Sequence, residues 1–146
     1  MKDLIVFDAG DLGKFLVYNI GLFDDEYDML GFMDENADKA GGELCGLPIL
    51  GIDYLQSGHA DDLCMVIAIS CPAIKEIIYE KLKPYNLIFP IFIASNSWLS
   101  KKVDTGYGII ICTNTSINFE WEICDFVMLN SGCYIGYNVS IVRFTT

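Results

Sequence analysis

An isoleucine or leucine recurs at every sixth position through the last third of the sequence, without a break. The six residues are Ile111, Ile117, Ile123, Leu129, Ile135 and Ile141. The position two residues before each is β-branched, aromatic or apolar: Ile109, Thr115, Trp121, Val127, Cys133 and Val139. A step of six matches neither the helix period nor strand alternation, and a fixed repeat favours a solenoid. We therefore predict a triangular β-helix with one hexad on each flat face. The alternative is a β-sandwich whose spacing is accidental.

Residues 1–95 show a different pattern, in which strand-like and helix-like segments alternate. The predicted strands are 3–7, 29–33, 47–50, 63–70 and 89–94. The predicted helices are 12–20 and 73–83, with a helical turn at 53–56. This alternation predicts an α/β fold with a small Rossmann-like parallel sheet. The chain then divides into an α/β domain at 1–95 and a partial β-helix of about two coils at 96–146.

Charge and composition exclude several classes of protein. Twenty acidic and nine basic residues give a net charge of −11, which argues against binding nucleic acid or an anionic membrane surface. No apolar run reaches the roughly 18 residues that span a bilayer, and the N-terminus lacks a signal-peptide pattern. We therefore expect a cytoplasmic protein. Six cysteines without a CxxC motif and a single histidine, His59, predict reduced, mostly buried thiols and no metal site.

The two halves together resemble a family of bacterial sugar acetyltransferases, which O-acetylate sialic acid or N-acetylate amino sugars. The segments that carry the resemblance are LIVFDAGDLGK (4–14), LGFMDEN (30–36), GLPILG (46–51), VIAIS (66–70), IYEKLK (78–83) and NSGCYIGYN (130–138). It implies a Rossmann-like domain that binds a nucleotide sugar, followed by a left-handed β-helix. It also implies acetyl transfer from acetyl-CoA to a sugar in polysaccharide or amino-sugar modification, by a homotrimer.

A glycine-containing turn follows the first predicted strand. Residues 8–13 read D-A-G-D-L-G, so Gly10 and Gly13 keep two positions of the G-x-G-x-x-G phosphate motif while Asp8 replaces the first. Asp34 ends the second strand, where a carboxylate can accept from ribose hydroxyls. The predicted substrate-binding residues are Ala9, Gly10, Asp11, Leu12, Gly13, Asp34 and Ser70. The alternative is a structural turn beside a solvated acid.

The nature of the ligand follows from the resemblance. It implies a nucleotide sugar, with a uridine diphosphate sugar as the family expectation. Because the glycine motif is incomplete and acidic, we expect binding to be weak or absent. A nicotinamide-binding redox domain is a weaker alternative, since nothing else in the chain supports it.

The resemblance also locates a catalytic position on the β-helix. The family motif N-[ST]-x-x-x-[IV]-x-H-[DE] begins at Asn130, and its histidine and acid fall on Tyr137 and Asn138. Tyrosine ordinarily titrates near pH 10 and is a poor base at neutral pH. A second departure is IAS (93–95), where the family commonly has His-Pro-Ser. We read His59 as a solvated loop residue and therefore expect activity to be lost or impaired.

Three further features bear on function. Cys133 lies near the catalytic position but lacks a basic neighbour that would favour its thiolate. Phe119 and Trp121 are expected on the β-helix surface as subunit contacts rather than as a sugar-stacking platform. The acetyl-CoA groove of the family runs along later coils, so we expect no acetyl-CoA binding in this form, whether it is a fragment or a natural chain. The second hypothesis is a non-catalytic nucleotide-sugar-binding or oligomerisation subunit.

Overall fold

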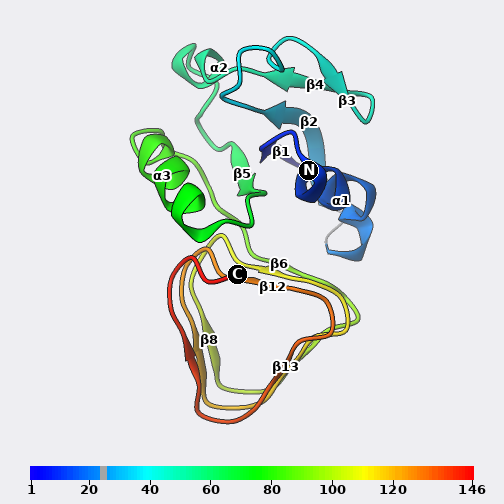
Figure 1. The fold of residues 1–146 in the computed structure, drawn as a ribbon, viewed down its shortest axis with the longest axis vertical. Helices are drawn as coiled ribbons and strands as arrows, with labels where there is room; N and C mark the ends of the chain where they lie inside the picture. The colour runs from blue at the N-terminus through cyan, green and yellow to red at the C-terminus, as the bar shows by residue number, and fades with distance from the viewer. Residues whose placement is uncertain (24–25) are drawn as a thin grey trace.

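The first half is a five-stranded sheet with helices on both faces (Figure 1). The computed structural model describes residues 1–23 and 26–146. The strands are β1 (Lys2–Phe7), β2 (Tyr27–Met33), β3 (Glu43–Leu44), β4 (Leu47–Leu50) and β5 (Cys64–Ile67), in the order β3-β4-β2-β1-β5. All neighbours are parallel except β3 and β4. The helices are α1 (Asp11–Tyr18), η1 (Ile20–Leu22), α2 (Asp53–Gln56) and α3 (Pro72–Leu82). The predicted Rossmann-like sheet is confirmed.

Alternation along β1 explains the two layers, because successive side chains of a strand point to opposite faces. Leu4 and Val6 pack with Leu16 of α1. Ile5 and Phe7 pack on the other face with the α3 residues. All four β1 side chains are almost fully buried, as expected for a central strand of a covered parallel sheet. The core therefore fixes the carboxyl end of β1, where the glycine turn begins.

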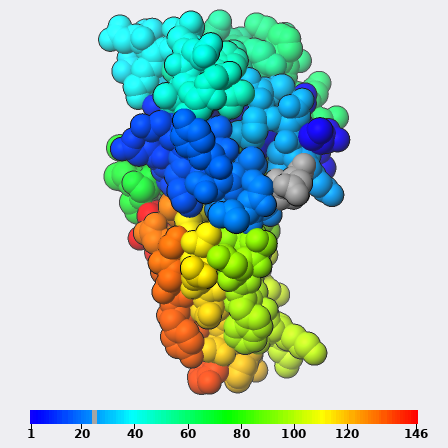
Figure 2. Space-filling model, turned by 90° about the vertical axis from the view of Figure 1, so that its right-hand side faces the viewer, coloured from blue at the N-terminus to red at the C-terminus, as the bar shows by residue number. Residues whose placement is uncertain are grey.

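The second half is a triangular prism of stacked coils (Figures 1 and 2). Its nine short strands are β6 (Phe92–Ile93), β7 (Trp98–Leu99), β8 (Val103–Thr105), β9 (Ile110–Ile111), β10 (Ser116–Ile117), β11 (Trp121–Ile123), β12 (Met128–Leu129), β13 (Tyr134–Ile135) and β14 (Ser140–Ile141). They form three parallel sheets: β6-β9-β12, β7-β10-β13 and β8-β11-β14. Ile111 pairs with Ile93 on one side and with Leu129, 18 residues later, on the other.

The prism therefore has three coils, rather than the expected two. The predicted strand 89–94 shrinks to β6, which pairs with β9 of the prism instead of closing the Rossmann-like sheet. That sheet gains only an isolated bridge between Cys64 and Ile88. The first coil escaped the sequence pattern because Thr105 stands in its series of inward aliphatic positions, where Ile123 and Ile141 follow in the next two coils.

The corners of the prism share one backbone conformation. Positive φ angles recur every six residues, at Lys102, Gly108, Asn114, Glu120, Phe126, Gly132, Asn138 and Phe144. Each bend of the chain between two faces thus uses a single residue in the left-handed backbone region, which residues other than glycine adopt at a cost. The hexad period of the sequence is therefore the spacing of these corners.

The interior confirms the aliphatic ladder and corrects two surface expectations. Ile111, Ile117 and Ile123 are at most 1% exposed. Trp121, expected on the surface, is buried, and its indole N–H donates to the carbonyl of Gly136. Of the six cysteines, which were expected to be mostly buried, Cys71 is exposed. Trp121 turns inward because it occupies the second apolar position of its hexad.

One face and one corner of the prism join the two halves. The face β6-β9-β12, here called the domain face, buries Phe92 and Met128 in the same core cluster as α1. At the corner of residues 106–108, 124–126 and 142–144, the Phe126 and Phe144 rings lie parallel 5.4 Å apart, and Tyr79 of α3 contacts Phe126. Buried Lys75 of α3 donates to the Phe126 carbonyl oxygen at 3.0 Å. Within the described residues, none of the helices has the length and apolar character needed to cross a bilayer.

Candidate functional site

Three loops meet at the carboxyl edge of the Rossmann-like sheet. The glycine turn follows β1, Asp34 follows β2, and Ser70 lies beyond the end of β5. β1 lies between β2 and β5. The chain leaves β1 through α1 on one face of the sheet and leaves β5 through α3 on the other face. Such a switch point opens a crevice at the carboxyl ends of the strands, where open α/β sheets bind ligands. The topology therefore brings the expected substrate-binding residues to one edge.

Asp34 connects two of these loops. One carboxylate oxygen accepts from the Asn36 N–H at 2.8 Å, and the other accepts from the Ala9 N–H at 3.1 Å. The Lys39 ammonium lies 3.4 Å from both Asp34 Oδ2 and the Ala9 carbonyl oxygen. Burial would raise the pKa of Asp34, but the hydrogen bonds and Lys39 outweigh it and lower that pKa. Asp34 is thus ionised, and it is only 8% exposed. Its hydrogen bonds to the Ala9 and Asn36 N–H groups, here called the Asp34 clamp, hold the glycine turn against the loop after β2.

Asp8 is the unusual residue of the turn. Its φ is +88°, a conformation that suits glycine better than aspartate. Burial, followed by the charge of Asp34, raises the pKa of Asp8. The carboxylate also lies against Gly10, where an added Cβ would come within 2.5 Å of Asp8 Oδ2. Asp8 therefore strains the turn and adds negative charge to it.

Gly13 allows α1 to approach the sheet. A Cβ at this position would collide with the Asp8 carbonyl oxygen and press on Phe32 at 3.1 Å. Leu12 and Ala9 pack their side chains against the core under α1. Both residues remain partly exposed. Gly13 serves the close helix packing that the last glycine of a phosphate motif provides.

The first turn of α1 has free donors. Gly10 caps the helix without a side-chain hydrogen bond, so the leading N–H groups have no intrahelical acceptor. Asp11 is exposed and pairs with Lys14 at 2.8 Å, which lowers the pKa of Asp11. Such amides attract phosphate. The exposed Ser70 stays a predicted ligand contact.

The predicted catalytic residues lie at two different corners of the last coil. Tyr137 and Asn138 form the corner after β13, whereas Asn130 follows β12 at the preceding corner. Tyr137 is 59% exposed, and its ring contacts that of Phe119, with centroids 4.9 Å apart and the planes tilted by 36°. Asn138 has a φ of 54° and so supplies the backbone of its corner. Asn130 is exposed, and its carbonyl oxygen accepts from Thr115 Oγ1. Among the described residues, no hydrogen bond joins Tyr137 to Asn130 or Asn138.

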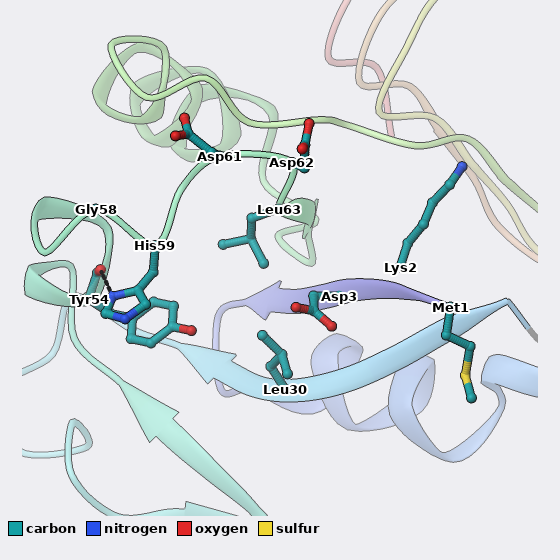
Figure 3. Close-up of a pocket in the computed structure, with 10 residues that line it drawn as sticks. All are labelled: Met1, Lys2, Asp3, Leu30, Tyr54, Gly58, His59, Asp61, Asp62 and Leu63. Carbon is teal, nitrogen blue, oxygen red and sulfur yellow. Dashed lines mark hydrogen bonds between the residues drawn. The ribbon is translucent and has the colours of Figure 1, made fainter.

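His59 and Cys133 lie away from these groups. The His59 ring stacks on Tyr54 at 4.5 Å, and its Nδ1 lies 3.3 Å from the Tyr54 carbonyl oxygen. Both rings line a cavity of about 350 Å³ at the opposite, amino edge of the sheet, together with Asp3 (Figure 3). Cys133 is half-buried against the interior of the prism. Neither residue can act at the glycine turn or at Tyr137 through direct contact.

Sequence reasoning missed Lys39 and Asn36. Lys39 is the cation at the Asp34 clamp, and Asn36 donates its backbone N–H to Asp34 and accepts from the Asp38 N–H. Their only signal was a lysine and an asparagine in the loop that follows a strand-terminal acid. Among the described residues, no group of three or more His, Cys, Asp or Glu side chains could hold a metal ion.

Solved structures that include acetyltransferases share this fold. The acetyltransferase domain of PglB from Neisseria gonorrhoeae is 19% identical, with a TM-score of 0.77 over 99% of this chain and 69% of that one. PerB from Caulobacter crescentus, solved with CoA and GDP-perosamine, is 18% identical, with a TM-score of 0.76 over 92% and 63%. WeeI from Acinetobacter baumannii is 20% identical, with a TM-score of 0.56 over 96% and 69%. The chain thus spans 63–69% of the length of these structures.

The family assignment comes from the sequence. A comparison with curated proteins gives no significant match. The family model of the PglD N-terminal domain matches residues 3–82, which is more than half of the chain. That range contains the glycine turn, Asp34, Ser70 and all three α-helices. The chain therefore belongs to the PglD N-terminal domain family.

Proposed function

We propose that this chain is a sugar-acetyltransferase-type protein that binds a nucleotide sugar at the carboxyl edge of its Rossmann-like sheet, and that its acetyl-transfer activity is lost or impaired. The observation that carries the proposal is the Asp34 clamp. It holds the backbone of the glycine turn at Ala9, beside the uncapped first turn of α1. A diphosphate at those amides and a ribose near Asp34 fit this arrangement.

Charge limits the affinity. Asp8, Asp11 and Asp34 surround a turn whose nearby cations are Lys14 and Lys39, and each lysine already pairs with one of these carboxylates. A diphosphate must therefore enter against uncompensated negative charge, which weakens its binding. The bound sugar is a nucleotide-linked amino sugar, with uridine diphosphate as the first choice. Because PerB was solved with GDP-perosamine, guanosine diphosphate is the second.

The proposal of impaired chemistry rests on the second corner of the prism, defined as residues 100–102, 118–120 and 136–138. Acetyl transfer needs a base that removes a proton from the attacking hydroxyl or amine. Tyr137 occupies the family histidine position and lies open to solvent, with Asn138 in place of the orienting acid. The family relationship implies acetyl-CoA as the acetyl donor. Tyr137 and Asn138 do not supply the base that transfer from this donor needs.

The two faces that meet at the second corner support a homotrimer. The face β7-β10-β13, here called the aromatic face, exposes Trp98 and Tyr134. The face β8-β11-β14, here called the acidic face, exposes Asp104 beside Glu122 in register. Packing an aromatic face on a neighbour would bury apolar surface that a monomer leaves in water. The six unpaired cysteines agree with a reducing cytoplasm.

Titration calorimetry with UDP- and GDP-linked amino sugars tests the binding proposal. We expect saturable binding by the wild type and its loss in Gly10→Val, because the added side chain covers the backbone that a phosphate approaches. Gly136→Val is the matched control, since a Cβ there meets nothing within 4 Å. Thermal unfolding shows that both variants fold. Equal affinity in wild type and Gly10→Val would reject the glycine turn as the site.

Restoring the base tests the impaired chemistry separately. The double variant Tyr137→His, Asn138→Asp supplies the family pair, and aspartate tolerates the positive φ of position 138 better than most residues. Acetyl transfer from acetyl-CoA to the bound amino sugar is then measured against the wild type. A gain supports an acetyltransferase that has lost its base. Binding without any gain supports the second candidate, a non-catalytic nucleotide-sugar-binding subunit.

A further inference from the structure

The cavity of about 350 Å³ at the amino edge of the Rossmann-like sheet lies opposite the glycine turn (Figure 3). Its walls come from the start of β1, the middle of β2, the helix α2 and residues 58–63, which lead into β5. All of its lining residues precede residue 64, so the cavity is separate from the prism. Its volume falls in the range of roughly 300–1,000 Å³ that small-molecule sites occupy.

The base of the cavity is apolar and fixed by the core. Leu63 is 3% exposed and Leu30 is half-buried, and both pack in the core cluster that contains Ile5. In Figure 3 the two leucine side chains lie between the Tyr54 and His59 rings on one side and Lys2 on the other. Methylene groups that settle on these leucines would be removed from water, which is favourable.

One wall is an ordered pair of aromatic rings. The Tyr54 and His59 rings are stacked, with centroids 4.5 Å apart and an interplanar angle of 14°. His59 Nδ1 also lies 3.3 Å from the Tyr54 carbonyl oxygen. Rings that are already held in place lose little freedom when a ligand packs on them. A tyrosine ring also attracts an ammonium group, so this wall suits methylene groups and cations alike.

Three carboxylates surround the cavity. Asp3, Asp61 and Asp62 line it and are exposed, and no ion pair among the described residues includes any of them. Two of them act on the same buried thiol. Burial is the main cause that raises the pKa of Cys64, Lys2 opposes the rise, and Asp3 and Asp62 add to it. Asp3 and Asp62 therefore approach one another although they are distant in sequence.

The charge of the cavity favours a cation with separated positive groups. Lys2 and Met1 also line it, and Figure 3 places both on the side away from the ring pair. The carboxylates therefore dominate the side nearer the rings, which disfavours a phosphate. Among the described residues, no group of three His, Cys, Asp or Glu side chains is close enough to hold a metal ion. Carboxylates spread around a rim suit charges that are joined by a chain.

We propose that this cavity binds a diamine or polyamine, with ammonium groups at Asp3 and Asp62 and the methylene chain on Leu30, Leu63 and the ring pair. Ammonium groups donate charge-assisted hydrogen bonds to carboxylates. A single exposed ion pair contributes little, so affinity comes from two or more such pairs acting together with the apolar base. The proposal does not depend on the glycine turn.

His59 reports on the cavity directly, because it is the only histidine of the chain. Its ring proton signals are followed by NMR in protein made without a histidine tag, at about 0.15 M salt, where diffuse electrostatic attraction is screened. We expect putrescine and spermidine to shift these signals in a saturable way. Butane-1,4-diol, which lacks the amines, should have no effect. No shift with spermidine, or an equal shift with the diol, would overturn the proposal.

Two further probes distinguish the kinds of cation. Butylamine meets only one carboxylate and should bind at least several-fold more weakly than putrescine. Equal affinity for the two amines would reject a diamine site. Mg²⁺ at the same concentration of charge should not displace spermidine. Displacement by Mg²⁺ would show that the cavity responds to any compact cation and would also reject the proposal.

A charge-matched pair of variants tests the carboxylates. Asp3→Asn with Asp62→Asn should weaken spermidine binding by roughly tenfold or more. Glu43→Gln with Glu76→Gln removes the same charge from exposed positions on β3 and α3 and should leave the affinity unchanged. Thermal unfolding shows that both variants fold. Equal weakening in both would overturn the proposal, because it would reflect net charge alone.

Discussion

The glycine turn is the expected binding region and the second corner is the expected catalytic region. The two differ in the contacts that surround their residues. At the turn, Asp34, Ala9 and Lys39 are held together by hydrogen bonds and an ion pair. At the second corner, Tyr137 and Asn138 project from a backbone bend into solvent. The contrast shows that the residues of the turn are fixed by contacts that also hold the fold, whereas those of the second corner are exposed and can be substituted at little cost to stability.

The largest effect that we predict is a difference in the free energy of unfolding between glycine substitutions in the two regions. Gly13→Ala should lower the free energy of unfolding by about 3 kcal/mol, because its Cβ meets the backbone of Asp8 as well as Phe32. Gly136→Ala at the second corner should change it by less than about 0.5 kcal/mol, since the site is open. Chemical denaturation measures both. A small loss in Gly13→Ala would mean that the turn can shift, and the contrast would fail.

The next effect concerns Lys75, which links α3 of the Rossmann-like half to Phe126 of the prism. Burial lowers the pKa of Lys75 to about 8 from an ordinary value of 10.5. Between these values the unfolded chain holds the proton and the folded chain does not, so stability rises with pH across this window. The expected rise is about 3 kcal/mol, because each pKa unit corresponds to about 1.4 kcal/mol. It should be absent in Lys75→Met, as pH-dependent denaturation can show. An identical pH profile in the variant would remove Lys75 as the source.

A single substitution should raise the affinity of the glycine turn for a nucleotide sugar. Asp8→Gly removes a carboxylate from the phosphate path and places glycine at a φ of +88°. We expect nucleotide-sugar affinity to rise roughly tenfold, or about 1.4 kcal/mol. Wild-type binding should also tighten as pH falls toward the raised pKa of Asp8, while the variant loses this dependence. Calorimetry at several pH values measures both, and weaker binding in the variant would make Asp8 a ligand contact.

The smallest effect belongs to the second corner. Tyr137→Phe should alter neither nucleotide-sugar affinity nor stability by more than about 0.5 kcal/mol, because the hydroxyl is at an exposed position and the ring still contacts Phe119. Leu16→Ala, in the core under α1, is the positive control for the stability assay. A Tyr137→Phe variant that lost measurable acetyl transfer would show that the tyrosine replaces the family base.

The sequence predicted the parts of this structure that repeat. Hexad spacing identified the prism, and the second apolar series already contained Trp121, so its burial was readable from the same pattern. The first coil was harder, because Phe92 and Ile93 lie in an apolar run that also suits a buried parallel strand. The period becomes unbroken only after Thr105. Local composition cannot distinguish a sheet strand from a coil strand when both are covered.

The candidate site, like the fold, was only partly predictable from the sequence. The glycine spacing and the acid at the end of β2 predicted that these residues meet at one edge of the sheet, since parallel strands end together, and the structure brings them to that edge. The Asp34 clamp could not be read, because it depends on how closely the two loops approach through Ala9 and Asn36.

The regular spacing of left-handed corners sets the ways in which the prism can change length. A residue inserted within a face would displace every later corner and turn inward side chains outward, whereas an insertion at a corner can bulge into solvent. Removing one hexad would rotate everything after it by one face, so the acidic face would continue in line with the aromatic one. Only a gain or loss of 18 residues, the pairing step of the coils, leaves all three faces aligned. Relatives of different length should therefore differ by whole coils or by loops at corners.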